Sequence, residues 1–258
     1  MELAGRVAVI TGGGDGIGAA LARAFAAEGA AHVAVADLNG QAADAVAAEI
    51  GGSSFQLDAA DAAAVSAMTE SVMRQHGPID LLCANAGIAT AGDVDSEGDT
   101  WQRAWNVNVM SQVHAARAVL PSMLARGAGY LMLTSSAAGL TTSLDSAPYA
   151  VTKHASIALA EWLAITYGDR GIAVSCLAPQ FVDTAMGRSA MTTPAASAWV
   201  AQIMIDPADV AASVIAGLRA ESFLILPHPE VAGYFQNKAA GYDRWIGGMR
   251  KLRADFEE

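Results

Sequence analysis

The 258-residue sequence contains little cysteine, few charged residues and no long uninterrupted apolar run. Its two cysteines, Cys83 and Cys176, each lie within a short apolar segment, so we expect two buried thiols and no disulfide. No apolar run approaches the ~20 residues that a membrane-spanning helix needs, which excludes such a helix. The first residues lack the charged and apolar regions of a signal peptide, so we expect a cytoplasmic protein.

Positive charge is also scarce, because 15 lysines and arginines face 26 acidic residues and leave a formal net charge of −11. An acidic surface repels nucleic acid and anionic membranes, so we expect neither as a partner. The five histidines are scattered without the spacing of metal ligands, and no metal site is predicted. A hydrophobic content of 53% with only 16% charged residues indicates a folded protein with a large core.

Short β-branched segments alternate with alanine-rich helical segments along the chain. The expected strands are Val7–Thr11, His32–Asp37, Ser54–Leu57, Leu81–Ala84, Gly129–Thr134, Ala173–Leu177 and Phe223–Leu226. The expected helices are Gly16–Glu28, Gln41–Ile50, Ala60–Gln75, Thr100–Arg126 (as one or two helices), Pro148–Gly168 and Pro207–Ala220. This alternation predicts a single-domain α/β fold over residues 1–258, a Rossmann-type doubly wound parallel sheet with helices on both faces.

Two segments interrupt the alternation. Residues 185–206 follow a strand without a regular partner helix and are predicted to form a substrate lid or loop, with Arg188–Ser197 as its flexible-looking part. Residues 227–258 form a C-terminal tail that is rich in aromatic side chains. We expect this tail either to pack over the active site or to form a subunit contact.

The turn after the first strand reads Thr-Gly-Gly-Gly-Asp-Gly-Ile-Gly over residues 11–18. A glycine cluster alone is also typical of a flexible turn. Here it lies between a strand and a helix, where missing side chains let a pyrophosphate reach the helix N-terminus. The context therefore predicts a dinucleotide site.

Asp37 ends the second strand, where a carboxylate can accept hydrogen bonds from the adenosine ribose hydroxyls. It would repel the 2′-phosphate of NADP, and Asp15 adds a second negative charge nearby. The alternative is that Asp37 is a solvated acid capping the next helix. We expect NAD as the cofactor.

Several ordered motifs resemble those of the short-chain dehydrogenase/reductase family from residue 5 to about residue 226. Gly12, Gly16 and Gly18 match its glycine loop, and Asn85-Ala86-Gly87 matches its central motif. The resemblance implies a catalytic tetrad of Asn108, Ser136, Tyr149 and Lys153. The cofactor-binding residues that it implies are Gly12, Asp15, Gly16, Ile17, Gly18, Asp37, Leu38, Asp58, Ala59, Asn85, Ala86, Gly87, Tyr149, Lys153, Pro179, Val182 and Thr184. The chain departs from the family in having Gln180 after Pro179, where the family usually has glycine.

The chemistry of this tetrad follows from residue types and spacing. Tyr149 and Lys153 are four residues apart in a helical segment and therefore share one face. A nearby cation favours the phenolate and is expected to lower the pKa of Tyr149 toward the working range of a base. Ser136 would stabilise the developing alkoxide, and the resemblance assigns Asn108 a water that links Lys153 to solvent. Each residue alone has a structural alternative, as a helix surface pair, a turn or cap, or a backbone partner.

The substrate is expected to be an uncharged, fairly apolar secondary alcohol or ketone, of steroid-like, aryl or alicyclic type. The residues expected to contact it are Ser136, Ala138, Leu144, Tyr149, Gln180, Phe181 and Met186, with Leu140, Met191 and Trp199 in the same wall. One alternative is a reductase of 3-oxoacyl thioesters on an acyl carrier protein, which its usual NADPH preference disfavours. Another is a catalytically silent dinucleotide-binding sensor, which the retained Tyr149 and Lys153 disfavour. The resemblance also implies a homo-oligomer, a tetramer or dimer, joined through the helices within residues 101–126 and 149–168.

Overall fold

The computed structural model describes residues 1–189 and 193–257, without the side chains of 194–196 and 257. Its strands are β1 (Val7–Thr11), β2 (His32–Asp37), β3 (Ser53–Gln56), β4 (Leu81–Ala84), β5 (Gly129–Thr134), β6 (Ile172–Leu177) and β7 (Leu224–Ile225). The helices are α1 (Gly16–Ala27), α2 (Gly40–Ile50), α3 (Ala62–His76), α4 (Gly98–Trp105), α5 (Ser111–Arg126), α6 (Ala147–Tyr167), α7 (Ala185–Ser189), α8 (Pro194–Ile203), α9 (Pro207–Ala220), α10 (Glu230–Ala240) and α11 (Tyr242–Glu257), with short turns η1 to η3.

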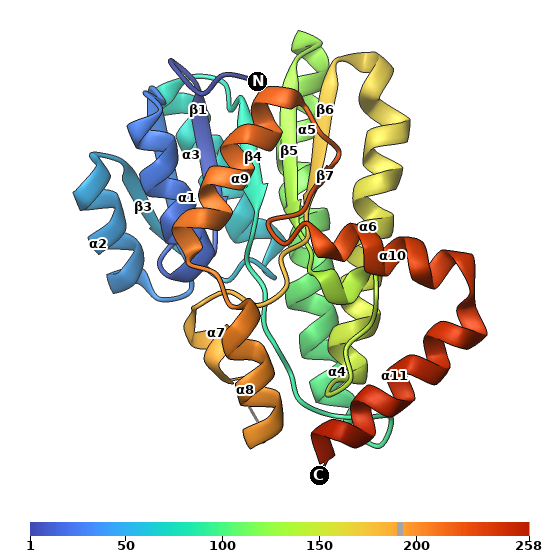
Figure 1. The fold of residues 1–258 in the computed structure, drawn as a ribbon. Coiled ribbons are helices and arrows are strands. Elements are labelled where there is room, and N and C mark those ends of the chain that lie inside the picture. The colour runs from blue at the N-terminus through green and yellow to red at the C-terminus, as the bar shows by residue number, and fades with distance from the viewer. Residues whose placement is uncertain (190–192, 258) are drawn as a thin grey trace.

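The strands form one parallel sheet in the order β3-β2-β1-β4-β5-β6-β7, which confirms the predicted doubly wound fold (Figure 1). The chain adds strands outward from β1 in one direction and then crosses to β4 to continue in the other. At this reversal the loops after β1 and β4 diverge, and a crevice opens at the carboxyl ends of the strands. The predicted catalytic residues lie in the segments that follow β4 and β5: Asn108 is in η1, Ser136 follows β5 directly, and Tyr149 and Lys153 are in α6.

Each face of the sheet carries its own apolar core. Alternate residues of β1 point to opposite faces, with Val7 and Val9 in one core and Ala8 and Ile10 in the other. The predicted buried thiols are confirmed, because Cys83 and Cys176 are free and buried in different cores. Among the described residues, no helix is both long and apolar enough to cross a bilayer.

Three segments differ from the sequence-based expectation. The expected helix or helix pair over 100–126 is one continuous helical stretch, in which the π-helical turn η1 (Asn106–Met110) joins α4 to α5. The expected lid over 185–206 contains two helices, α7 and α8, and the tail after residue 227 folds into α10 and α11. These helices lack a sheet neighbour, so the strand–helix alternation gave no signal for them.

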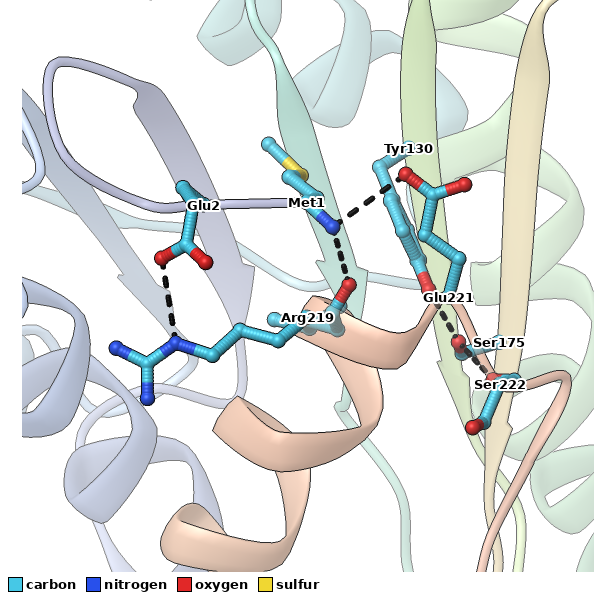
Figure 2. Close-up of polar contacts among 8 residues, drawn as sticks. Met1, Glu2, Tyr130, Ser175, Arg219, Glu221 and Ser222 are labelled. Atoms are coloured by element: carbon cyan, nitrogen blue, oxygen red, sulfur yellow. Dashed lines mark hydrogen bonds and ion pairs between the residues drawn. The ribbon is translucent and has the colours of Figure 1, made fainter.

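A second group of polar contacts lies away from the predicted site, around the N-terminal residue and the end of α9 (Figure 2). The Tyr130 hydroxyl lies 2.6 Å from Ser175 Oγ, which donates to the Ser222 carbonyl at 2.6 Å. The amino group of Met1 contacts the Leu218 carbonyl and Glu221, and Arg219 pairs with Glu2. These contacts join β5 to β6 and the N-terminus to the end of α9. None of them involves a predicted site residue.

Candidate active site

The β1–α1 turn can be built only with glycine at two of its positions. Gly12 has φ +64°, and a Cβ there would lie 2.9 Å from Ala86 Cα. A Cβ on Gly18 would lie 1.9 Å from the Gly12 carbonyl oxygen. Since the first N–H groups of a helix, including those of Ile17 and Gly18, lack intrahelical partners, they can donate to a phosphate. The turn therefore fits the pyrophosphate of a dinucleotide.

Gly16 brings this turn against the loop after β6. It opens α1 at φ +52°, and a Cβ there would lie 2.9 Å from Thr184 Cγ2. Thr184 Oγ1 accepts from Gly187 N at 3.0 Å and so begins α7, while Val182 is buried and pairs with Ile205. The two loops predicted to bind the phosphates and the nicotinamide are thus neighbours.

Asp37 is fixed beside the glycine loop. Its carboxylate accepts from Gly14 N at 2.9 Å and from Asn39 N at 2.9 Å. The cap of α2 is Asn39, whose side chain accepts from Ala42 N, so Asp37 is not the capping residue. An ionised carboxylate has about four acceptor positions, which leaves acceptors for further donors.

Three other predicted adenosine contacts lie in the loops after β2 and β3. Leu38 is exposed, Ala59 is buried, and Asp58 accepts from Ala60 N at 2.8 Å. Asp15 accepts from Gly16 N at 2.7 Å and caps α1. Asp15, Leu38 and Asp58 are exposed at this edge of the sheet and are open to a dinucleotide.

Asn85 ties the central strand ends together. Its Nδ2 donates to the Gly12 carbonyl at 3.0 Å, and its Oδ1 accepts from Thr134 Oγ1 at 3.1 Å. Thr11 Oγ1 accepts from the backbone N–H groups of Asn85 and Ala86 at 3.1 and 3.2 Å. Asn85 therefore holds the shape of the crevice, and Thr134 is a partner that sequence reasoning did not identify.

The predicted catalytic residues come together at the start of α6. The Ser146 side chain accepts from Tyr149 N at 3.1 Å and places Tyr149 in the first helical turn. Ser136 Oγ accepts from Ala138 N at 3.1 Å, and Ser136 lies close enough to Tyr149 to lower its pKa. Pro179 is held beside them, because its carbonyl accepts from Ala137 N at 2.8 Å and from Ser136 Oγ at 3.4 Å. Two hydroxyls thus meet at the carboxyl edge.

The expected lowering of the Tyr149 pKa is wrong for this state of the protein. Burial raises the pKa of Tyr149, and the nearby Ser136 offsets this only in part. Lys153 Nζ lies 5.5 Å from the centre of the Tyr149 ring, over its face. At this distance the ammonium group adds little to the stability of a Tyr149 phenolate.

Lys153 is a buried cation. It is 4% exposed, and burial lowers its pKa to about 8. Its Nζ donates to the Thr134 carbonyl at 3.3 Å, and the described part of the chain provides no ion pair for it. A Cβ on Gly87 would lie 3.3 Å from both Lys153 Nζ and Asn108 Oδ1. Gly87 therefore leaves space beside the ammonium group.

Replacing Lys153 with methionine is expected to increase stability while it removes activity. The folded pKa near 8 lies below the ordinary lysine value of 10.5, so the parent gains stability as pH rises between these values. At neutral pH the charge costs about 2 to 4 kcal/mol, which Lys153→Met would recover. Denaturant unfolding across this pH range checks the prediction. An equally steep rise of stability in the variant would contradict it.

Asn108 lies in the π-helical turn, a feature frequent at functional sites. Its Oδ1 accepts from Ile88 N at 2.8 Å, while Nδ2 donates to the Ile88 carbonyl at 3.0 Å and to Thr152 Oγ1 at 3.1 Å. The structural alternative for Asn108 is thus observed. It fixes the segment after β4 against α6, and the link to water stays a prediction.

The profile of the short chain dehydrogenase family matches residues 6–195. The chain belongs to this family. It is 34% identical to D-threitol dehydrogenase of Mycolicibacterium smegmatis over 75% of this chain and 76% of that protein. A short chain dehydrogenase/reductase from Burkholderia phymatum in complex with NAD superimposes with a TM-score of 0.84 at 27% identity, covering 94% of this chain and 96% of that one. A 7α-hydroxysteroid dehydrogenase complexed with NADH and 7-oxo glycochenodeoxycholic acid gives 0.80 at 30% identity, covering 87% and 93%.

In this family member, α8 and α11 pack together on the loop after β6. The Phe181 and Trp199 rings pack edge to face at 5.7 Å between centroids, and Phe256 of α11 lies 5.7 Å from Trp199. Gln180 N donates to Nδ1 of the buried His228 at 3.1 Å, and His228 Nε2 lies 2.9 Å from the Ile203 carbonyl. The tail therefore packs on α8 and on the loop after β6, and its place at the active site or at a subunit contact stays a prediction. No sequence pattern indicates the role of His228, because its hydrogen-bond partners, Gln180 and Ile203, lie far from it in the sequence.

The expected substrate residues of the dehydrogenase are only partly brought together. Leu144 lines a cavity of about 690 Å³ with Phe256 and the turn before α6, and Met186 is 40% exposed on α7. Ala138 is half-buried next to Ser136. Leu140 is part of the core instead, because its side chain packs among buried residues under α6. Met191 lies outside the described residues.

A buried lysine, Lys238, connects the tail to the turn that follows Ser136. Lys238 Nζ of α10 donates to the Leu140 carbonyl at 2.9 Å and lies 3.2 Å from His154 Nε2. It also lies 5.5 Å from the centre of the Tyr242 ring at the start of α11. Leu140 follows Ser136 by four residues, so α10 holds the turn that carries Ser136.

Replacing Lys238 with methionine should therefore lower kcat while leaving the KM for NAD nearly unchanged. Loosening the Ser136 turn misplaces its hydroxyl, and we expect a loss of about tenfold. Steady-state kinetics measure the effect, with the exposed Lys251→Met as the matched control. An equal loss in both variants, or no loss in Lys238→Met, would refute this role.

Proposed function

We propose that the protein is an NAD-dependent dehydrogenase that moves a hydride between nicotinamide and the carbon of a secondary alcohol or ketone. The observation that carries this proposal is the grouping of Ser136, Tyr149 and Lys153 at the carboxyl edge, beside a glycine turn that fits a pyrophosphate. Bound NAD supplies the hydride acceptor. The side chains of the protein transfer the proton and stabilise the charge on the substrate oxygen.

In the oxidation direction, Tyr149 acts as the phenolate, after its own proton has passed to solvent. It takes the hydroxyl proton of the substrate as the carbinol hydrogen leaves as hydride to NAD. Ser136 donates to the substrate oxygen and stabilises the alkoxide-like charge. Lys153 contributes positive charge under the Tyr149 ring and faces the space that Gly87 leaves open, where the nicotinamide ribose would lie. Ketone reduction follows the same path in reverse, with Tyr149 returning the proton.

The preference for NAD rests on Asp37 at the glycine turn. We infer that Asp37 and Leu38 bind the adenosine ribose, Asp58 and Ala59 the adenine, and Val182 and Thr184 the nicotinamide carboxamide. The 2′-phosphate of NADP would meet the Asp37 carboxylate, and Asp15 lies in the same turn. The similar structures that hold NAD and NADH support this choice.

The substrate class that we propose is an uncharged secondary alcohol or ketone with a largely hydrocarbon skeleton, of steroid-like, aryl or alicyclic type. Leu144, Phe181 and Met186 would supply apolar surface for such a skeleton. Of the cations in this region, Arg188 is paired with Asp183 at 2.5 Å, and Arg253 lines the same cavity as Leu144. The similar hydroxysteroid dehydrogenase, whose ligand bears its oxo group on a fused-ring skeleton, supports an alicyclic carbinol.

We propose a homo-oligomer, a tetramer or dimer, joined through the continuous helical stretch of α4 and α5 and through α6. Trp105, Val151, Trp162 and Ile165 are all at least 40% exposed on these helices, as expected for a covered apolar surface. Light scattering of the purified protein tests this assembly. The two free buried thiols suit a reducing compartment such as the cytoplasm.

A panel of secondary alcohols and ketones, followed by NADH absorbance, tests the activity. We expect NADH to form with at least one alcohol and to be consumed by the matching ketone. Tight NADH binding without turnover of any member would contradict the proposal and favour a dinucleotide-binding sensor.

A further inference from the structure

A buried histidine, His228, connects three segments of the chain near the predicted catalytic serine. It lies in the turn between β7 and α10 and is 3% exposed. Its Nδ1 accepts from the backbone N–H of Gln180 at 3.1 Å, and its Nε2 lies 2.9 Å from the carbonyl of Ile203, the last residue of α8. The ring therefore joins the start of the tail to the loop after β6 and to the end of α8.

The two partners of His228 fix the position of its proton. A backbone N–H can only donate and a carbonyl can only accept, so Nδ1 is the bare nitrogen and Nε2 carries the proton. Both ring nitrogens are thereby used within the protein. A second proton would set the Nδ1–H against the Gln180 N–H and break this contact. His228 is therefore built as a neutral connector.

The contact with Gln180 is the first backbone hydrogen bond of the loop after it leaves the sheet. Ala178 N donates to the Ile225 carbonyl at 3.0 Å, next to the ladder of β6 and β7. Pro179 follows and has no N–H to donate. The N–H of Gln180 is next, and His228 accepts from it. The contact with His228 thus fixes the peptide between Pro179 and Gln180.

That peptide holds the turn that carries Ser136. The Pro179 carbonyl accepts from Ala137 N at 2.8 Å and from Ser136 Oγ at 3.4 Å. A peptide group is planar, so the direction of this carbonyl follows that of the Gln180 N–H. Rotation of the peptide would move the acceptor of Ser136. The place of the serine hydroxyl therefore depends on His228 through one rigid group.

The rest of the loop after β6 is held by other contacts. Ile205 N donates to the Phe181 carbonyl at 3.2 Å, and the Ile205 carbonyl accepts from Asp183 N at 2.9 Å. Val182 pairs with Ile205 between these two bonds. The residues proposed to bind the nicotinamide carboxamide, Val182 and Thr184, therefore lie in or beside a segment that does not need His228.

We propose that His228 is a positioning residue that sets the place of the Ser136 hydroxyl through Gln180 and Pro179. This inference rests on the proposed function, in which Ser136 stabilises the charge on the oxygen of the reacting carbon. A small misplacement of such a donor weakens its effect on the transition state. Loss of the contact should lower kcat by about tenfold and leave the KM for NAD within a factor of about two.

Two carboxamide variants separate the two hydrogen bonds of the ring. In His228→Asn the side-chain oxygen takes the place of Nδ1, so an acceptor for Gln180 N remains. In His228→Gln the amide takes the place of Nε2 and keeps only the bond to Ile203. We expect His228→Asn to retain kcat within about threefold and His228→Gln to lose about tenfold. The exposed His76→Gln, at the end of α3, is the matched control and should keep the parental kcat.

A double variant tests whether the effect passes through the serine. In the Ser136→Ala background, His228→Gln should cost less than about twofold in kcat, because the hydroxyl that it positions is gone. A further tenfold loss there would show that His228 acts on something other than Ser136. Equal losses in His228→Asn and His228→Gln would show that the ring serves packing alone. Either result would overturn the proposal.

Hydrogen exchange separates this proposal from the proposed function, because it needs no turnover. The Ala137 N–H donates to Pro179, so we expect its exchange to be faster in His228→Gln than in His228→Asn or the parent, with the amides of β1 as the reference for global stability. This result without turnover of any alcohol would support the positioning role and contradict the proposed function. Turnover by the parent, with kcat and exchange unchanged in both variants, would support the proposed function and overturn the positioning role.

Discussion

Replacing Tyr149 with phenylalanine is expected to lower kcat by at least about a thousandfold and to leave NADH affinity within a factor of about two. The change deletes one hydroxyl, the group that exchanges a proton with the substrate oxygen. The ring that Lys153 contacts at 5.5 Å remains, and so does the glycine turn that receives the cofactor. Steady-state kinetics give the loss in kcat, and fluorescence titration gives the affinity for NADH.

A second variant tests whether the loss in kcat comes from a missing hydroxyl at the substrate oxygen. Ser136→Ala removes the partner hydroxyl while retaining the turn around Ala137, and it should also lower kcat strongly. The double variant should be little worse than Tyr149→Phe, because both hydroxyls act on one oxygen. Losses that multiply in full would show that the two residues act separately and would contradict the shared site.

Replacing Asp37 with alanine is expected to reduce the preference for NAD over NADP by about a hundredfold or more. The carboxylate is held within 2.9 Å of Gly14 N, where the 2′-phosphate of NADP would bring like charges together at a cost of several kcal/mol. The variant should gain with NADP and lose about tenfold with NAD, because hydrogen bonds to the ribose are lost. The values of kcat/KM for both cofactors check this.

The matched control for Asp37 is the exposed Asp169→Ala, which removes the same charge far along the chain. It should keep the parental cofactor preference. Equal use of NAD and NADP by the parent would contradict the assignment of Asp37, and a shift of the same size in Asp169→Ala would show that net charge alone decides.

Much of the fold could be predicted because it depends on local signals. Apolar β-branched strands, the glycine turn and alanine-rich helices each occupy a short sequence window, and β1, β2, β4 and β5 have the predicted bounds. The resemblance to the family implies the tetrad through the order and spacing of its residues. Ser136 lies close enough to Tyr149 to offset part of the rise in its pKa, and the catalytic roles stay predictions.

The rest depends on contacts between residues far apart in the sequence. Lys238 donates to the Leu140 carbonyl, and His228 connects Gln180 to Ile203. No sequence pattern indicates these contacts of Lys238 and His228. The spacing between Tyr149 and Lys153 predicts a lowered pKa for Tyr149. In the structure both groups are buried, and burial raises the pKa of Tyr149 and lowers that of Lys153. Burial is a property of the packed structure, so sequence spacing gives the neighbour but not the balance of effects.

The most direct test of the central claim is a crystal structure with NADH and a ketone product bound. We predict that the Ser136 and Tyr149 hydroxyls both lie within hydrogen-bond distance of the ketone oxygen, that the carbonyl carbon faces the nicotinamide, and that Lys153 Nζ contacts the ribose beside Gly87. A Tyr149 hydroxyl turned away from the nicotinamide, with no room for a ligand between them, would contradict the account.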